Sequence, residues 1–177
     1  MNRIAKFSKV SYEQFKKDWL NAFDSYSEWD EDVVEKRIRN IYESIKLPKR
    51  ATCGSAGYDF FAPSNFCIPA DKTEKIPTGI RCEIDNGWVL KCYPRSSYGF
   101  KYGVSLSNTV GIIDEDYARS DNEGHIFIKL INDSAIAKTL EINCGDAFCQ
   151  GIFIPYGITY DDKVTTIRNG GIGSTGR

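Results

Sequence analysis

Three aspartates, Asp59, Asp114 and Asp116, occupy positions where a carboxylate could act as a base. Asp114 ends an apolar run in the segment GIIDEDY, so its side chain can point into a partly enclosed place, and Asp59 stands at the start of a predicted strand. Because His125 is the single histidine of the chain, a carboxylate is the natural general base for activating water. A lone aspartate at a strand end more often makes a turn, so the assignment needs support from other residues.

Two segments contain the residue types that bind phosphate. Arg95, Ser96 and Ser97 place a guanidinium beside two hydroxyls in a predicted turn, and arginine binds phosphate oxygens in a bidentate manner. The C-terminal GGIGSTGR, preceded by Arg168, combines glycines, hydroxyls and cations, which predicts a flexible flap over residues 168–177 that could surround an anion. The flap lacks the Walker spacing of a P-loop. In isolation, each segment would be an ordinary loop or tail.

The charge balance and the single histidine exclude several classes of protein. The chain carries 23 Lys and Arg against 24 Asp and Glu, a formal net charge of −1, which argues against a nucleic-acid partner. One histidine cannot build a multi-histidine zinc site, and a Ser-His-Asp or Cys-His site would have to use His125 itself. A small polyanion held by a few local cations is still compatible with this balance.

The N-terminal quarter of the chain has the apolar spacing of two helices. The pattern predicts a helical hairpin over residues 11–47, preceded by a short strand over 3–10. Ser11, with Gln14 three residues later, fits a capping box, and Pro48 ends the second helix. The apolar stripes consist of Tyr12, Phe15, Trp19, Leu20 and Phe23 in the first helix, and Val33, Val34, Ile38, Ile41, Tyr42 and Ile45 in the second.

The rest of the 177 residues has the texture of a mainly β domain. Turn signals recur about every 8–12 residues after Pro48, which is typical of a sandwich or barrel of short strands. Asn86-Gly87, between IRCEI and WVLKCY, predicts a tight hairpin. Residues 126–131 and 152–154 are nearly continuous apolar runs and predict buried strands.

Neither a signal peptide nor a membrane segment is visible in the sequence. Charges recur every few positions in the first thirty residues, and no apolar run approaches the ~18–20 residues of a membrane span. The six cysteines have no C-x-x-C spacing, so we expect reduced thiols, several of them buried as small hydrophobes. The sequence therefore predicts a cytoplasmic protein without a membrane partner.

Five segments together resemble the motifs of the homotrimeric dUTPase family. PRSSYGFKYGVSLSNTVGIIDEDY is similar to the second and third motifs without a gap, LPKRATCGSAGYD to the first, GDAFCQGIF to the fourth and RNGGIGSTG to the fifth. They occur in family order across residues 47–176. The resemblance implies a single domain over 1–177, with a jelly-roll-like β-sandwich (the dUTPase fold), an N-terminal helical hairpin insertion at 11–47 and a homotrimer with shared active sites.

The resemblance also implies hydrolysis of dUTP to dUMP and pyrophosphate, with Mg²⁺ on the triphosphate. Asp114 would deprotonate the water that attacks the α-phosphorus, and Gln150 would lie near that water or phosphate. Tyr117 would pack under the deoxyribose and exclude a 2′-hydroxyl, and Asp59 would hold the sugar end or metal-bound waters. The remaining implied substrate contacts are Arg95, Ser96 and Ser97 to phosphates, Asn108 and the backbone of Gly111 to Ile113 to uracil, and Arg168, Gly173, Ser174 and Thr175 over the β- and γ-phosphates.

The sequence departs from the family pattern in ways that leave two alternatives open. Residues 118–123 extend a loop after Tyr117, and Ile172 replaces the phenylalanine that commonly stacks on uracil. One alternative is a dCTP deaminase of the same fold, including its bifunctional form. The other is a dUTPase-like regulator that binds a protein through the hairpin and the 118–123 loop, which exposure of Trp19 and Trp29 would favour. His125 lies near no phosphate motif, and we expect it to be structural.

Overall fold

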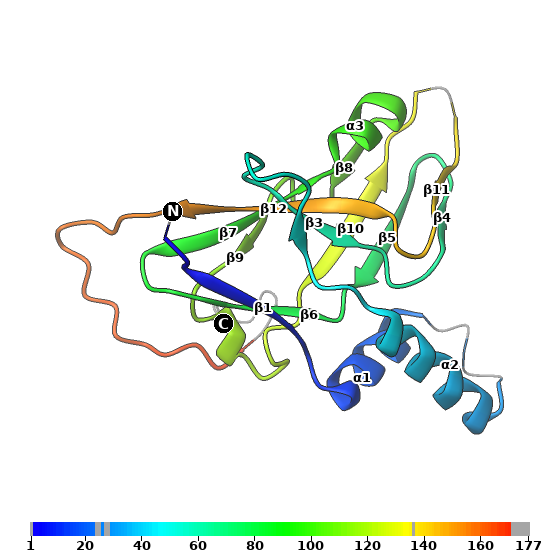
Figure 1. The fold of residues 1–177 in the computed structure, drawn as a ribbon, viewed down its shortest axis with the longest axis horizontal. Helices are drawn as coiled ribbons and strands as arrows, with labels where there is room; N and C mark the ends of the chain where they lie inside the picture. Colours follow the sequence, from blue (N-terminus) through cyan, green and yellow to red (C-terminus); the bar gives the residue numbers. More distant parts are fainter. Residues whose placement is uncertain (1, 24–25, 27–28, 136, 171–177) are drawn as a thin grey trace.

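A computed structural model describes residues 2–23, 26, 29–135 and 137–170 of the chain (Figure 1). Most of its elements are strands, and helices are concentrated near the N-terminus. In chain order the elements are β1 (Ala5–Lys9), α1 (Tyr12–Ala22), α2 (Glu31–Ser44), β2 (Lys49–Arg50), β3 (Tyr58–Phe61), β4 (Phe66–Ile68), β5 (Lys72–Pro77), β6 (Ile80–Ile84), β7 (Trp88–Pro94), α3 (Ser96–Tyr102), β8 (Val104–Leu106), β9 (Gly111–Ile113), the 3₁₀ helix η2 (Tyr117–Arg119), β10 (Phe127–Asn132), β11 (Leu140–Ile142) and β12 (Ala147–Pro155).

The strands form antiparallel sheets that enclose one core. The largest sheet has the order β2-β3-β12-β7-β9, and a second sheet has the order β5-β10-β8. Two further pairs, β1-β6 and β4-β11, complete the sandwich. Phe60, Leu90, Leu130 and Phe148 are fully buried between these sheets, and their burial supplies the main driving force for folding. The mainly β sandwich is therefore confirmed.

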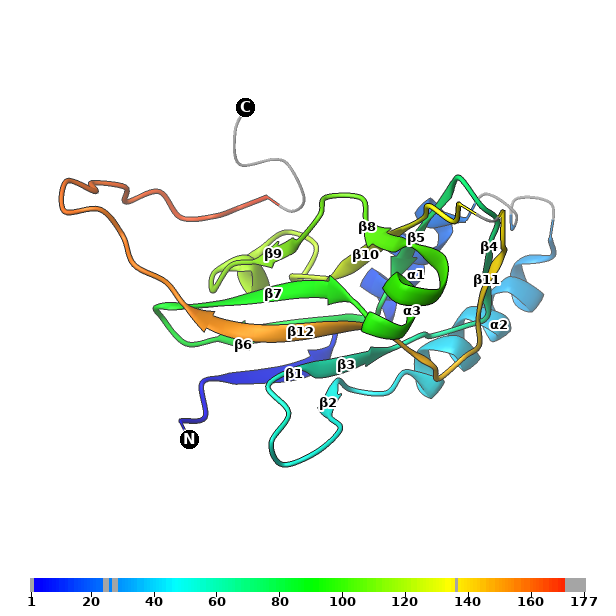
Figure 2. The ribbon, with the colours of Figure 1, turned by 90° about the horizontal axis from the view of Figure 1, so that it is seen from above.

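The predicted helical hairpin is present, and it packs on the chain's own sandwich. Helices α1 and α2 lie together at one end of the strands (Figures 1 and 2), and their Phe15, Trp19 and Ile38 belong to the same core cluster as the sheet residues. Ser11 caps α1 by accepting a hydrogen bond from the Gln14 N–H at 3.1 Å, as predicted. Trp19 is only 2% exposed and packs inside the protein, whereas Trp29 is 48% exposed.

The prediction of a tight β-hairpin at Asn86-Gly87 is wrong. Strand β6 pairs with β1, whereas β7 pairs with β12 and β9, so the two strands enter different sheets. The chain does turn here, and the Trp88 N–H donates to the Asp85 carbonyl at 3.3 Å. Of the two central residues only Gly87 has a positive φ (82°), whereas the type I′ hairpin turn needs a positive φ at both.

The two apolar runs form strands, but neither is buried on both faces. In β10, Ile128 and Leu130 are buried while Lys129 between them is exposed, which is the alternation of a half-buried strand. In β12, residues 152–154 are only half-buried, and Phe153 lines an open cavity of about 810 Å³. The prediction of full burial was therefore wrong for both runs.

Two expectations about the chain's environment can be compared with the structure. Within the described ranges, no helix is long and apolar enough to cross a membrane. All six cysteines are free, and Cys82, Cys92 and Cys149 are buried, as predicted for thiols that act as small hydrophobes. Burial raises the pKa of Cys82 to about 12, so this thiol stays protonated and unreactive.

Candidate active site

The candidate base Asp114 forms a cluster with an arginine from the C-terminal part of the chain. Asp114 directly follows β9, and its half-exposed carboxylate accepts a hydrogen bond from Arg168 Nη2 at 2.5 Å. Arg168 Nε donates to Asp116 Oδ1 at 2.7 Å, so one guanidinium joins two carboxylates. The side chain of Arg168 is only 14% exposed. The structure thus brings together two of the predicted site residues with Asp116, a carboxylate that stands out in the sequence but to which no role was given.

Tyr117 lies beside this cluster and is held at its phenol end. The residue is 6% exposed, its hydroxyl donates to the His125 carbonyl at 3.0 Å, and it accepts from Asn122 Nδ2 at 3.2 Å. The guanidinium carbon of Arg168 lies 5.7 Å from the centre of the Tyr117 ring, within cation–π distance. Burial raises the pKa of Tyr117, so the phenol is neutral and serves as a hydrogen-bond donor.

A second group of predicted residues meets at the other end of the large sheet. Asp59 in β3 pairs directly with Gln150 in β12, so both half-buried side chains lie on the same face. A Cβ on Gly57 would come within 2.6 Å of Gln150 Oε1, so this glycine makes room for the glutamine side chain. Arg95 precedes α3, and its N–H and Nη1 donate to the carbonyls of Phe148 and Ala147 at 3.2 and 3.4 Å.

The predicted uracil-binding residues lie in the β8–β9 connection and in β9 itself. Asn108 is exposed in this connection, and Thr109 adopts a positive φ of 65°. Strand β9, which contains Gly111 and Ile113, pairs with β7 on one side and forms the edge of the large sheet as far as the chain is described. An edge strand presents backbone N–H and C=O groups in a row, and such a row can pair with the polar edge of a base.

The two groups of site residues are well separated within one chain. Ile113, next to Asp114, pairs with Leu90 of β7, five positions before Arg95. At about 3.3 Å per residue, those positions span about 17 Å along the strand. Asp59, Gln150 and Arg95 therefore lie at a different place on the sheet from Asp114, Tyr117 and Arg168.

Four residues of the predicted C-terminal flap cannot be placed in the structure. Gly173, Ser174 and Thr175, together with Ile172, lie outside the described residues. Among the residues that are described, no group of three or more His, Cys, Asp or Glu side chains converges to hold a metal ion. His125 is fully buried between α1 and the β5–β6 connection, in agreement with a structural role.

The antiparallel fold and these polar groups define a class of protein, a β-sandwich with candidate phosphate- and base-binding residues at the ends and edge of one sheet. The sequence model of the dUTPase family matches residues 43–176, and the chain belongs to that family. A deoxyuridine 5′-triphosphate nucleotidohydrolase from Lactococcus lactis subsp. lactis (strain IL1403) is 39% identical over 135 residues, which cover 75% of this chain and 89% of that relative.

Solved structures give the same answer for the fold. The dUTPase from Streptococcus mutans is 37% identical, with a TM-score of 0.58 over 66% of this chain and 90% of that one. A dUTPase from phage phi11 of Staphylococcus aureus, described with a coordinated structural Mg(II) ion, is 20% identical with a TM-score of 0.58 over 72% and 95% of the two chains. The family match begins at residue 43, after most of the helical hairpin.

Proposed function

We propose that this protein hydrolyses dUTP to dUMP and pyrophosphate. The observation that carries the proposal is the cluster of Asp114, Tyr117 and Arg168 directly after the edge strand β9. It combines a carboxylate that solvent can reach, a fixed aromatic ring, a cation and a row of backbone groups. These are the parts that a pyrophosphohydrolase needs to hold a base, a sugar and a phosphate chain next to a water molecule.

Asp114 is the general base in this mechanism. Its carboxylate takes a proton from water as the water oxygen bonds to the α-phosphorus, and the bond to the leaving pyrophosphate breaks with its electron pair on the pyrophosphate oxygen. In the free chain this carboxylate is paired with Arg168. Because the Asp114 side chain is 49% exposed, the ion pair is weak, and the triphosphate can draw the guanidinium away and leave the carboxylate to the water.

The sugar and base are recognised by the elements on both sides of Asp114. Tyr117 presents its ring to the deoxyribose, and a ring held at its hydroxyl by two hydrogen bonds cannot move aside for a 2′-hydroxyl. Uracil pairs with the backbone of Gly111 to Ile113 and with Asn108, because β9 is an edge strand there. The flap beginning at Arg168, with Gly173, Ser174 and Thr175, closes over the outer phosphates.

The active site is shared between subunits of a homotrimer. The roughly 17 Å that separates the Asp114 cluster from Arg95 along β7 is too long for both to contact one phosphate group within a single chain. A neighbouring copy therefore supplies Arg95, Ser96, Ser97 and Gln150. Size-exclusion chromatography with light scattering tests this assembly, and a stable, active monomer would contradict it.

The chain fits a magnesium ion that is bound mainly by substrate. Mg²⁺ is commonly bound through one or two carboxylates together with the phosphates of a nucleotide, and Asp59 is a half-buried carboxylate on the same face as Gln150. Asp59 would therefore hold the ion through waters. When bound, the ion neutralises charge on the phosphates. We also expect the reaction to take place in the cytoplasm.

A pyrophosphate-release assay with dUTP, dTTP, UTP and dCTP, with and without Mg²⁺, tests this function. We expect Asp114→Asn to retain dUTP binding and to lower kcat by about 10²–10⁴-fold, the usual contribution of a general base. If Asp114→Asn turns over dUTP as fast as the unmodified chain, Asp114 is not the general base. Ammonia release from dCTP would instead identify a deaminase, and equal rates with dUTP and UTP would contradict the role of Tyr117.

A further inference from the structure

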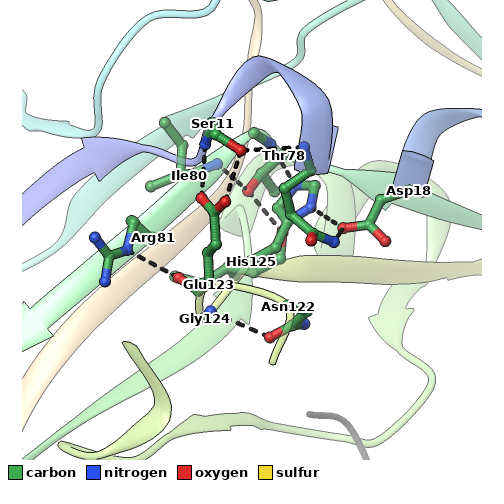
Figure 3. Close-up of polar contacts among 12 residues, drawn as sticks. Ser11, Asp18, Thr78, Ile80, Arg81, Asn122, Glu123, Gly124 and His125 are labelled. Carbon is green, nitrogen blue, oxygen red and sulfur yellow. Dashed lines mark hydrogen bonds and ion pairs between the residues drawn. The ribbon is translucent and has the colours of Figure 1, made fainter. Parts of the chain in front are cut away.

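The helical hairpin is joined to the loop that follows Tyr117 by a long-range helix cap. Glu123, at the end of the 118–123 loop, accepts the Ser11 N–H at 2.7 Å and the Ser11 hydroxyl at 2.6 Å (Figure 3). In a capping box the residue three positions along the helix would accept that N–H. Here the Gln14 side chain turns to Asp18 instead, at 2.8 Å, and Glu123 takes over its role from 112 residues away.

A second connection joins α1 to the segment after the loop. His125 is fully buried, and its Nε2 accepts the Gly79 N–H at 2.8 Å, so the ring proton is on Nδ1. Nδ1 donates to Asp18 Oδ2 at 2.6 Å (Figure 3). Burial by itself would raise the pKa of Asp18, but the hydrogen bonds from His125 and Gln14 outweigh it and keep the pKa below its usual value. The bond is therefore charge-assisted at neutral pH.

The segment fixed in this way holds the phenol of Tyr117. The Tyr117 hydroxyl donates to the carbonyl of His125 and accepts from the side chain of Asn122. The Asn122 side chain is itself oriented by accepting the Gly124 N–H at 3.1 Å. The phenol thus bonds to Asn122, which adjoins Glu123, and to His125, which itself contacts α1.

The segment has little freedom to move independently of Tyr117. Gly124 has a φ of +71°, and a Cβ there would lie 2.5 Å from Ala118 Cα and 2.7 Å from the Tyr117 carbonyl oxygen. Arg81 in β6 donates to the carbonyl of Glu123 at 2.8 Å (Figure 3) and to that of Ala118 at 2.7 Å, so it connects the two ends of the loop. A displacement of Glu123 or His125 is therefore transmitted to the Tyr117 ring.

We propose that Ser11, Glu123, Asp18 and His125 are positioning residues for Tyr117, so that the helical hairpin sets how strictly this protein rejects a ribose substrate. The inference rests on the proposed function, because it assigns Tyr117 to the sugar. None of the four residues is among the proposed substrate contacts. They act by keeping the ring in place, and a displacement of about 1 Å at such a position can change rates by as much as 10²-fold.

The test is the ratio of kcat/KM for dUTP to that for UTP in matched variants. Glu123→Ala removes both contacts to Ser11, and Asp121→Ala removes an exposed carboxylate of the same loop as a control. We expect Glu123→Ala to lower the ratio roughly three- to tenfold, within the range of coupling between residues of one network, and Asp121→Ala to leave it unchanged. Asp18→Asn, an isosteric change on α1, should lower the ratio as well, and it serves as the test if Glu123→Ala does not fold.

A double-mutant cycle distinguishes positioning from general destabilisation. Tyr117→Phe keeps the ring and removes the hydroxyl through which the network acts. The dUTP/UTP ratio of Tyr117→Phe/Glu123→Ala should therefore be no lower than that of the less selective single variant. Additive losses, or a lower melting temperature with an unchanged dUTP/UTP ratio, would overturn the inference while the proposed function stands. Absence of dUTP hydrolysis by the unmodified chain would refute the proposed function and the inference together.

Discussion

Gly124 is a position where the fold has no room for a single added methyl group. The residue has a φ of +71°, and its Cα faces the backbone of the preceding 3₁₀ helix. A Cβ there would lie 2.5 Å from Ala118 Cα and 2.7 Å from the Tyr117 carbonyl oxygen. Both atoms belong to the backbone, so they cannot move aside as the end of a flexible side chain would. We therefore expect Gly124→Ala to be strongly destabilising.

The magnitude follows from two separable contributions. An alanine held in the left-handed region costs about 1–2 kcal/mol, and overpacking against atoms that cannot retreat costs about a further 1–3 kcal/mol. The expected loss in the free energy of unfolding is the sum, about 2–5 kcal/mol. Gly87→Ala is the matched control, because Gly87 has a φ of +82° but nothing lies within 4 Å of an added Cβ. The control should lose only the conformational contribution of about 1–2 kcal/mol.

Urea denaturation of the three chains at one protein concentration measures both values. The midpoints should fall in the order unmodified chain, Gly87→Ala, Gly124→Ala, with equal slopes, and the two variants should differ by about 1–3 kcal/mol. Equal losses in the two variants would refute the reasoning. That result would mean that the 118–123 loop adjusts to a side chain at Gly124 and is not held against Tyr117.

Three other perturbations give distinct outcomes. Gly57→Ala would place a Cβ 2.6 Å from Gln150 Oε1, a movable side-chain end. The free energy of unfolding in urea should therefore change by less than about 1 kcal/mol, while dUTP turnover falls roughly tenfold. Lys16, with Tyr12 and Arg39, lowers the pKa of Glu35 from 4.5 to about 2. Because the folded-state pKa is the lower one, the stability advantage over Glu35→Gln should be complete above pH 4.5 and disappear as the pH falls through about 2, which urea midpoints across that range can follow. Removal of residues 168–177 should abolish hydrolysis and leave the far-UV circular dichroism and the oligomeric state unchanged.

Local features of the fold were predictable from the sequence because they depend on neighbours along the chain. The helical hairpin follows from apolar spacing, and the Ser11 cap follows from its position before the first stripe. The failure at Asn86-Gly87 has a physical cause. A turn sequence specifies that the chain reverses, but it does not decide which strands pair afterwards, and β6 takes β1 while β7 takes β12.

The candidate site shows the same division between local and long-range information. Asp114 and Tyr117 could be assigned because they lie close together in one motif, and Asp59 and Gln150 because each lies in a motif of its own. The partners Ser11–Glu123 and Asp18–His125 are 112 and 107 residues apart. Side-chain hydrogen bonds between distant segments have no periodicity, so a single sequence contains no signal for them.

The helical hairpin and the 118–123 loop form one structural unit, although they come from different parts of the chain. Each segment supplies hydrogen-bond partners to polar groups of the other. Without α1, the Nδ1–H of fully buried His125 would lose its carboxylate partner Asp18, and an unsatisfied buried donor costs about 1–3 kcal/mol. Without Glu123, the Ser11 N–H would lose its cap. A change that removes either segment therefore destabilises the other, and because Tyr117 hydrogen-bonds to this shared unit, such a change also reaches the candidate sugar pocket.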